Sequence, residues 1–147
     1  MAITTNAITN SFKEDLLQGT QVFAAGAGNT FKLALYTSAA TIGADTTSYA
    51  VGIGGQVGDT GSYAAGGGAL VTALVSVNGT TAFVDYNDLS FTGVTLTARG
   101  ALIYNDTQAG DPSVCVLDFG GDKTATAGTF TIQFPNANDT QAIIRIS

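Results

Sequence analysis

The stretch ALVTALVSVNGTTAFVDY, residues 69–86, decides the fold class. Residues 69–77 are mostly β-branched or apolar, and residues 80–86 resume that character after Asn78 and Gly79. Asn-Gly is favoured in two-residue hairpin loops because a type I′ turn needs positive φ at both central positions. The sequence therefore predicts a β-hairpin with Asn78 and Gly79 in a type I′ turn.

Further strands are expected on both sides of this hairpin. Residues 31–36 alternate apolar side chains with others, which is typical of a half-buried strand. A long strand over 94–104 contains Gly100, which indicates a bulge or a close approach of another backbone. Three more strands are expected over residues 113–119, 129–134 and 142–146, with a turn at 120–123. Phe130, Ile132 and Phe134 are expected to share one face.

One short helix is expected near the N-terminus, over residues 11–18. Ser11 and Glu14 have the spacing of a capping box, in which each side chain bonds the other residue's backbone N–H. Gly19 is a natural end for this helix. Residues 1–10 have no helical period and are expected to form an extended arm, either frayed or docked on something.

A long glycine-rich loop is expected between residues 38 and 68. Loops of such length in compact domains are usually functional or disordered. The loop contains the large apolar and aromatic residues Tyr49, Ile53, Val57 and Tyr63, which a disordered linker seldom carries. We expect a projecting loop, with or without a short edge strand, that becomes ordered against a partner. The alternative is a flexible surface loop with no partner.

Together these elements predict an all-β fold, an antiparallel β-sandwich of the jelly-roll or immunoglobulin-like type. Seven or eight strands recur at intervals of about 10–15 residues, with almost no helix between them. The length of 147 residues is that of one domain. We therefore expect a single β-sandwich domain over residues 11–147, preceded by the arm.

Composition excludes several classes of function. The chain has 5 Lys and Arg against 11 Asp and Glu, a net charge of −6, so nucleic-acid binding is not expected. It has no His and one Cys, so no zinc or other transition-metal site, no cofactor and no intramolecular disulfide are expected. No uninterrupted apolar run of about 20 residues occurs, and neither a membrane span nor a cleaved secretion signal is expected.

Enzymatic activity is not expected either, and no catalytic residue is assigned. Without His, the Ser-His-Asp and Cys-His arrangements cannot form. The cluster at residues 85–88 is best explained as a turn between two strands, and Cys115 as an inert thiol within a strand. Arg99 is expected to pair with an Asp such as Asp118 or Asp85, within the domain or across a subunit boundary.

Several segments together resemble a family of small structural proteins of tailed bacteriophages and prophages. They are NSFKEDLLQG (10–19), FKLALYTS (31–38), ATIG (40–43), YAAGG (63–67), TARGALIYN (97–105), VLDFG (116–120) and FTIQFP (130–135). The resemblance runs from about residue 10 to the C-terminus, and these segments are folding and assembly elements, not active-site motifs. It implies a virion protein that is synthesised in the host cytoplasm.

Within that family the composition favours a capsid decoration, or cement, protein. Such a protein binds the assembled shell through arms and neutral surfaces, so the expected partners are the major capsid protein or other virion proteins, and a homo-oligomer is expected. The alternatives are a tail, baseplate or head–tail connector protein, or a glycan- or receptor-binding module of a tail fibre. The residues expected at a protein interface are Ile3, Ile8, Phe12, Tyr49, Ile53, Tyr63 and Arg99.

Overall fold

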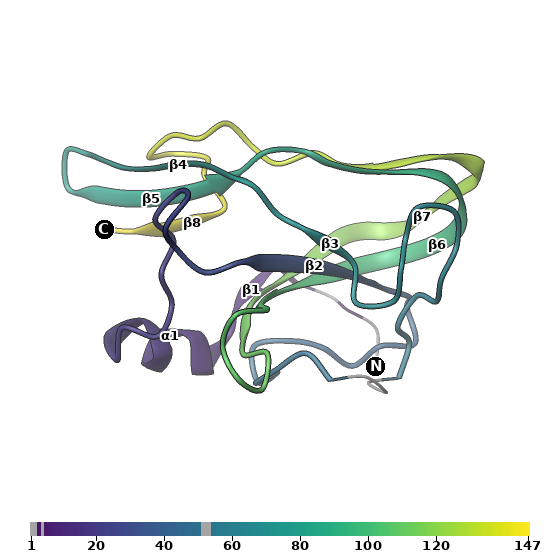
Figure 1. Ribbon diagram of the computed structural model, residues 1–147, viewed down its shortest axis with the longest axis horizontal. Helices are drawn as coiled ribbons and strands as arrows, with labels where there is room; N and C mark the ends of the chain where they lie inside the picture. The colour runs from purple at the N-terminus through teal and green to yellow at the C-terminus, as the bar shows by residue number, and fades with distance from the viewer. Residues whose placement is uncertain (1–2, 4, 51–53) are drawn as a thin grey trace.

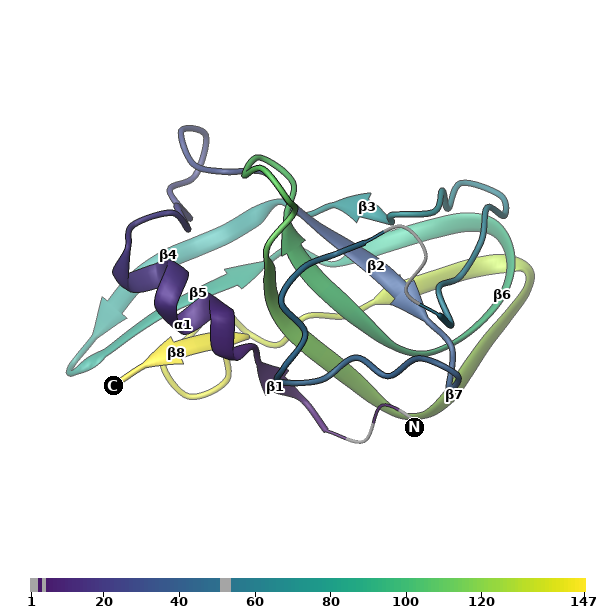
Figure 2. The same cartoon turned by 90° about the horizontal axis from the view of Figure 1, so that it is seen from below.

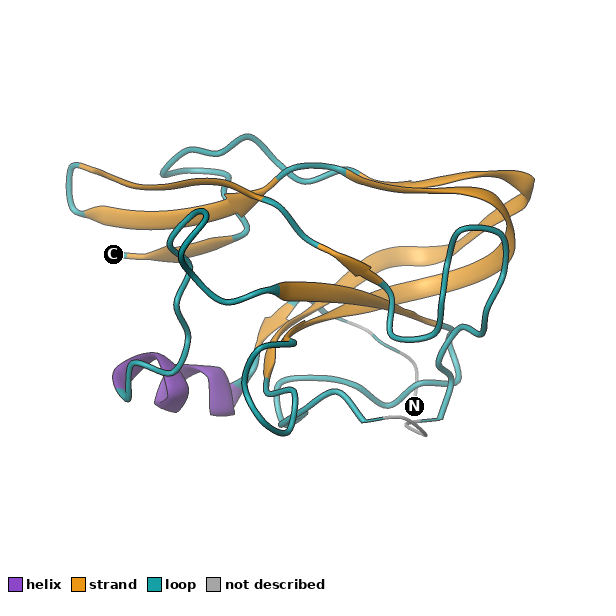
Figure 3. Cartoon of the chain, in the orientation of Figure 1, coloured by secondary structure: helices purple, strands orange, loops and turns teal. Residues whose placement is uncertain are grey.

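The computed structural model describes residues 3, 5–50 and 54–147, and the fold is all-β, with antiparallel sheets and one short helix (Figures 1 and 3). The predicted fold class is confirmed. The elements are β1 (Ala7–Ile8), α1 (Asn10–Leu17), β2 (Phe31–Tyr36), β3 (Gly68–Ala69), β4 (Thr72–Asn78), β5 (Thr81–Tyr86), β6 (Leu89–Asn105), β7 (Ser113–Ile132) and β8 (Ile144–Ile146). A five-stranded sheet has the order β1-β7-β6-β2-β3, and a three-stranded sheet has the order β4-β5-β8.

Strands β6 and β7 form one long hairpin that curves round one end of the molecule (Figure 1). Their pairing register shifts at three places between Phe91 and Gly100, and such bulges bend a strand and increase its twist. At Gly100 an added Cβ would collide with the carbonyl oxygen of Leu117 and press on Ile3. The bulge and the close backbone approach expected at Gly100 are therefore both present.

The turn predicted at residues 120–123 is wrong, because β7 runs straight through it as part of a 20-residue strand. Asp118 pairs with Gly100, and Lys123 pairs with Ala98, so the residues between them on β7 form an enlarged bulge. Gly120 lies there with φ of 72°, a conformation that glycine adopts at low cost. The Gly-Gly pair thus marks a bulge within one strand and not the end of a strand.

The predicted hairpin is confirmed, but its turn differs from the expectation. Asn78 pairs with Thr81, which leaves Gly79 and Thr80 as the two loop residues. Gly79 has φ of 57°, whereas Asn78 and Thr80 are not in the positive-φ region. Positive φ at the first loop residue alone is the pattern of a type II′ turn, in which glycine occupies that position.

The helix is confirmed within one residue at each end, but the predicted capping box is wrong. Its N-cap residue is Thr9, which makes no side-chain capping bond. The Ser11 hydroxyl instead lies 3.3 Å from the Ser113 hydroxyl, and the Glu14 carboxylate accepts from Gln18 one turn later. Ser11 therefore contacts β7, and the first N–H of the helix, that of Asn10, donates instead to the Ala44 carbonyl at 2.8 Å.

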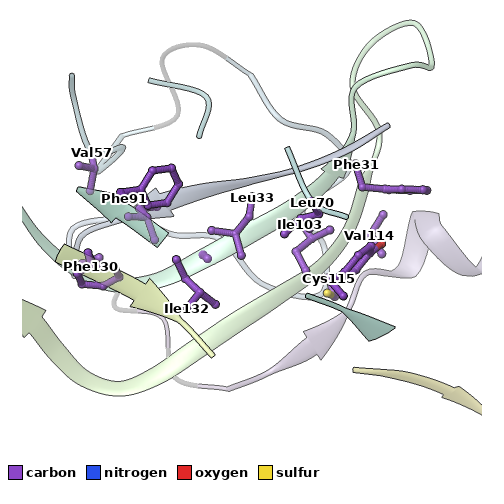
Figure 4. Close-up of a cluster of buried hydrophobic side chains, with 14 of the residues drawn as sticks. Phe31, Leu33, Val57, Leu70, Phe91, Ile103, Val114, Cys115, Phe130 and Ile132 are labelled. Atoms are coloured by element: carbon purple, nitrogen blue, oxygen red, sulfur yellow. The ribbon is translucent and has the colours of Figure 1, made fainter. Parts of the chain in front are cut away.

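Side chains from both sheets form the main hydrophobic core, and Figure 4 shows the part contributed by β2, β6, β7 and the adjoining loops. Phe31, Leu33 and Leu35 of β2 enter this core, as the alternation predicts. The intervening Ala34 and Tyr36 are buried as well, in a second cluster on the opposite face of the same strand. Strand β2 is therefore covered on both sides, and the prediction of a half-buried strand is wrong.

The second cluster exists because the long loop folds back under the five-stranded sheet (Figure 3). The ring of Tyr49 stacks on that of Tyr104 with 4.4 Å between centroids. The loop backbone also bonds the sheet, with Val57 N–H donating to the Leu35 carbonyl at 3.0 Å. The described part of this loop is thus packed on its own domain, in contrast to the predicted projecting loop.

Candidate interaction surface

Four of the seven predicted interface residues lie inside the domain. Ile3, Phe12 and Tyr63 are each 1–2% exposed, and Tyr49 is buried with them. Phe12 packs edge-on against Phe23 at 5.9 Å between ring centroids, which fixes α1 to the core. These four side chains cannot contact a partner while the fold is intact. Their predicted place at a protein interface is therefore corrected to a place in the core.

The predicted N-terminal arm is docked along its own domain (Figure 2). Ala7 and Ile8 form β1 and pair with Val116 and Cys115 of β7, and Ile8 is half-buried. The side-chain carbonyl of Asn6 accepts a 2.7 Å hydrogen bond from Asp118 N–H. The described residues of the arm are therefore held on the domain, with Ala7 and Ile8 as a short strand at a sheet edge.

Arg99 makes its ion pairs within the domain. Its Nε lies 3.5 Å from the Asp118 carboxylate, and its Nη1 lies 4.0 Å from that of Asp122. The expected pairing with Asp118 is confirmed, whereas Asp85 is buried in the other sheet. Both carboxylates flank the β7 bulge, so Arg99 braces that bulge. The remaining predicted interface residue, Ile53, lies outside the described residues.

Two side chains that could take part in catalysis, the Cys115 thiol and the Asp85 carboxyl, are buried within the domain. Cys115 lies in the core, where burial raises the pKa of its thiol to about 12. Asp85 is fully buried, and burial raises the pKa of its carboxyl. In the described ranges no three His, Cys, Asp or Glu side chains gather as a metal site, and no described helix has the length and apolar character for crossing a membrane.

A hollow of about 480 Å³ follows β7 near β1. Three of its four polar side chains, those of Asn6, Asp118 and Gln141, are engaged within the domain, and the fourth is Gln133. Asn6 bonds the Asp118 backbone, and the side-chain carbonyl of Gln141 accepts from both Asn136 and Asn138 at 3.0–3.1 Å. Because three of these four groups are engaged by the protein, the hollow offers no convergent polar set for a small ligand.

An exposed apolar surface instead lies over the small sheet and the end of α1. Large apolar side chains seldom cluster on a monomer's exterior without a binding role. Leu17 is 90% exposed and Val77 66% exposed. Val75 and Val77 share one face of β4 with Ile146 of β8 beside them, whereas Leu74 lies on the opposite face of β4. We call the following set the apolar surface: Leu17, Val75, Val77 and Ile146.

The face of the small sheet that looks toward α1 is hollowed. The hollow measures about 110 Å³, and its exposed lining is wholly apolar. Phe12, Leu16 and Phe23 line one side, and β4, β5 and β8 contribute the other with Val75, Ala82, Phe83, Val84, Ile144 and Ile146. We call this wall of the small sheet the inner face. It is an open apolar recess next to exposed Leu17.

The part of this surface that lies on the β4–β5 hairpin is also free of exposed charge. Between Asp59 and Asp85 the sequence contains no Asp, Glu, Lys or Arg, and β4 and most of β5 fall in that interval. The sequence contained this signal, because residues 69–71, 73–75 and 77 are apolar, a pattern that does not alternate. Such a run indicates a strand apolar on both faces, but it does not reveal that both faces are open to solvent.

The apolar surface is thus formed by the hairpin that decides the fold, with α1 at its border. Its chemistry suits contact with another protein, because it offers shape and apolar area without ionic groups. No family model, curated protein or solved structure matches the chain.

Proposed function

We propose that this protein is a structural component of a bacteriophage virion, a capsid decoration protein that binds the assembled shell. The observation that carries the proposal is the uncharged apolar surface around the inner face of the small sheet. The resemblance of seven sequence segments to phage structural proteins supports a place in the virion. The apolar surface supports attachment to another protein. Localisation to the virion and a partner among the shell proteins belong to the same proposal.

Attachment by this surface follows from hydrophobic burial. Fully burying a Val, Leu or Ile side chain contributes about 1.5–3 kcal/mol. Several such side chains, Leu17, Val77 and Ile146 among them, are more than half exposed in the free protein. A shell site of matching shape would bury them together, and each copy bound to the assembled lattice stabilises that lattice by mass action.

Co-sedimentation with undecorated shells tests this proposal. Leu17→Lys together with Ile146→Lys places two charges on the border and wall of the apolar recess. Both side chains are largely solvent-exposed, so the fold is expected to survive, as circular dichroism will verify. Since about 1.4 kcal/mol corresponds to a tenfold change in affinity, we expect binding to weaken by at least about tenfold.

The matched control is Thr126→Lys together with Thr129→Lys. Both residues are exposed on β7, and the change in net charge is the same. This control is expected to bind shells as the unaltered protein does. Equal binding by all three proteins, or no binding by the unaltered protein, would contradict the proposal. A copy number in particles far below that of the shell subunits would favour a tail or connector position instead.

A further inference from the structure

Strand β4 is the long open edge of the small sheet. At the outer edges of the two sheets, β1 and β3 have two residues each and β8 has three, whereas β4 has seven. An edge strand exposes a row of unpaired backbone N–H and C=O groups that can pair with another chain. Proteins usually protect such edges with short strands, charges, prolines or bulges.

The other edges carry such protection, and β4 carries little. Arg145 occupies the middle of the short β8, and the part of β7 beyond β1 contains the enlarged bulge with Asp122 and Lys123. Strand β4 has no charged residue and no proline, and its one bulge lies at its start, before Leu74. From Leu74 to Asn78 its register with β5 is regular.

We propose that β4 pairs antiparallel with β4 of a second copy of this chain. The pairing joins two three-stranded sheets into one continuous six-stranded sheet across a two-fold axis. Leu74 and Ser76 from one face of β4, and Val75 and Val77 from the other, then lie beside the same residues of the second copy. The contact is made by main-chain hydrogen bonds with apolar side chains on both faces.

A second copy is the occupant that matches β4, because its own β4 is an equally long, uncharged and unprotected edge. Each chain carries a net charge of −6, which opposes the association of two copies, so they are expected to meet through an uncharged part of their surfaces. The β4–β5 hairpin is such a part, and it projects from one end of the molecule (Figures 1 and 2). A charged partner would find no opposite charge on β4, whereas a second β4 is equally neutral and apolar.

The same features predict a closed dimer and not a filament. Growth of a filament requires β4 of one copy to pair with a different edge of the next. The β8 edge is three residues long and carries Arg145, and it is therefore a poor match for the apolar β4. When β4 of each copy pairs with β4 of the other, both unprotected edges are occupied, and a third copy finds no β4 edge to pair with.

Dimer formation also bears on the proposed function, although the pairing itself does not depend on it. A dimer presents two inner faces side by side, and a bivalent ligand binds a repeating lattice more tightly than either half does alone. The pairing is measured on the isolated protein without shells. Failure of the dimer therefore leaves the shell-binding result to be judged separately.

The test is the solution mass of the full chain, measured by light scattering from about 1 to 100 µM, within the range over which protein interfaces associate. The monomer mass is 14.8 kDa, and we expect twice this value. Leu74→Lys together with Ser76→Lys puts like charges across any symmetric β4 pair, and this variant is expected to be monomeric. The Thr126→Lys, Thr129→Lys protein is the control, with an equal change in net charge, and should remain dimeric.

Hydrogen exchange gives a second readout. In the unaltered protein, amide protection across residues 72–78 should increase with protein concentration, and in the Leu74→Lys, Ser76→Lys variant it should not. A monomer at every concentration would overturn the proposal, as would a dimer that survives the β4 substitutions in folded protein. A mass that grows without limit would also overturn it, because it requires an open pairing mode.

Discussion

The hydroxyl of Tyr63 accepts a 2.8 Å hydrogen bond from the backbone N–H of Leu35 in the interior of the protein. Tyr63 belongs to the long loop and Leu35 to β2, so this bond fastens the loop to the centre of the five-stranded sheet. Burial is the main reason that the pKa of Tyr63 rises to about 12, so the hydroxyl is protonated at neutral pH.

Tyr63→Phe should destabilise the fold by about 1–3 kcal/mol, because it leaves the buried Leu35 N–H without an acceptor. Chemical denaturation followed by fluorescence or circular dichroism measures this loss. Tyr86→Phe is the matched control, since the buried Tyr86 hydroxyl has no hydrogen-bond partner among the described residues. If both variants lose the same stability, the Tyr63 bond does not contribute as described.

Gly100→Ala should destabilise the protein by about 1–3 kcal/mol, a typical cost of overpacking. The added methyl group meets the Leu117 carbonyl of the neighbouring strand and the side chain of Ile3. Thermal unfolding compares it with Gly121→Ala, where an added Cβ has open space around it. Equal unfolding temperatures for the two variants would show that the backbone approach at Gly100 is not as close as found.

Asp85→Asn should stabilise the protein more at neutral pH than at pH 4. Burial raises the pKa of the folded Asp85 carboxyl above its ordinary value, and its Oδ2 has no partner among the described residues. The folded state therefore holds this proton more tightly than the unfolded state does. Stability from Asp85 is fully present below the ordinary pKa of about 3.9 and is lost as pH rises through the raised folded pKa.

Denaturation of both proteins across that pH range isolates this contribution, because the other carboxyl groups are common to both. The stability difference between Asp85→Asn and the unaltered protein should increase with pH and then level off. A difference that stays constant with pH would mean that Asp85 does not titrate within this range.

Ile3→Ala should destabilise the fold by about 2–5 kcal/mol, the usual cost of emptying a buried Ile site. Ile3 is 1% exposed and packs in the second cluster beneath the five-stranded sheet. Thr5→Ala, at an exposed position nearby, serves as the control in thermal unfolding. An unchanged unfolding temperature for Ile3→Ala would restore the idea of an arm that is free for a partner.

The strands and the hairpin were predictable because their signals are local. Alternation at residues 130–134 correctly places Phe130 and Ile132 inside and Thr131 outside, and Asn78-Gly79 correctly locates the hairpin. Glycine signals were less specific. The same local sequence, Gly120-Gly121, is compatible with a turn or a bulge, and the choice is made by pairing with β6, which is distant in sequence.

The candidate site was less predictable, since exposure depends on long-range packing. Tyr49 and Tyr63 lie in a segment without a period, so nothing local shows whether they face a partner or their own sheet. Leu74 and Val77 look like core residues by composition, yet they are exposed because no described element covers β4. The sequence therefore indicated a protein with few charged residues, but four of the side chains that it assigned to an interface, Ile3, Phe12, Tyr49 and Tyr63, are buried within the domain.

Reconstruction of a particle that carries this protein tests the central claim most directly. The account predicts one copy per repeating shell site, with the inner face of the small sheet and Leu17 of α1 against the shell surface. Particles in which this face points to solvent, or from which the protein is absent, would contradict it.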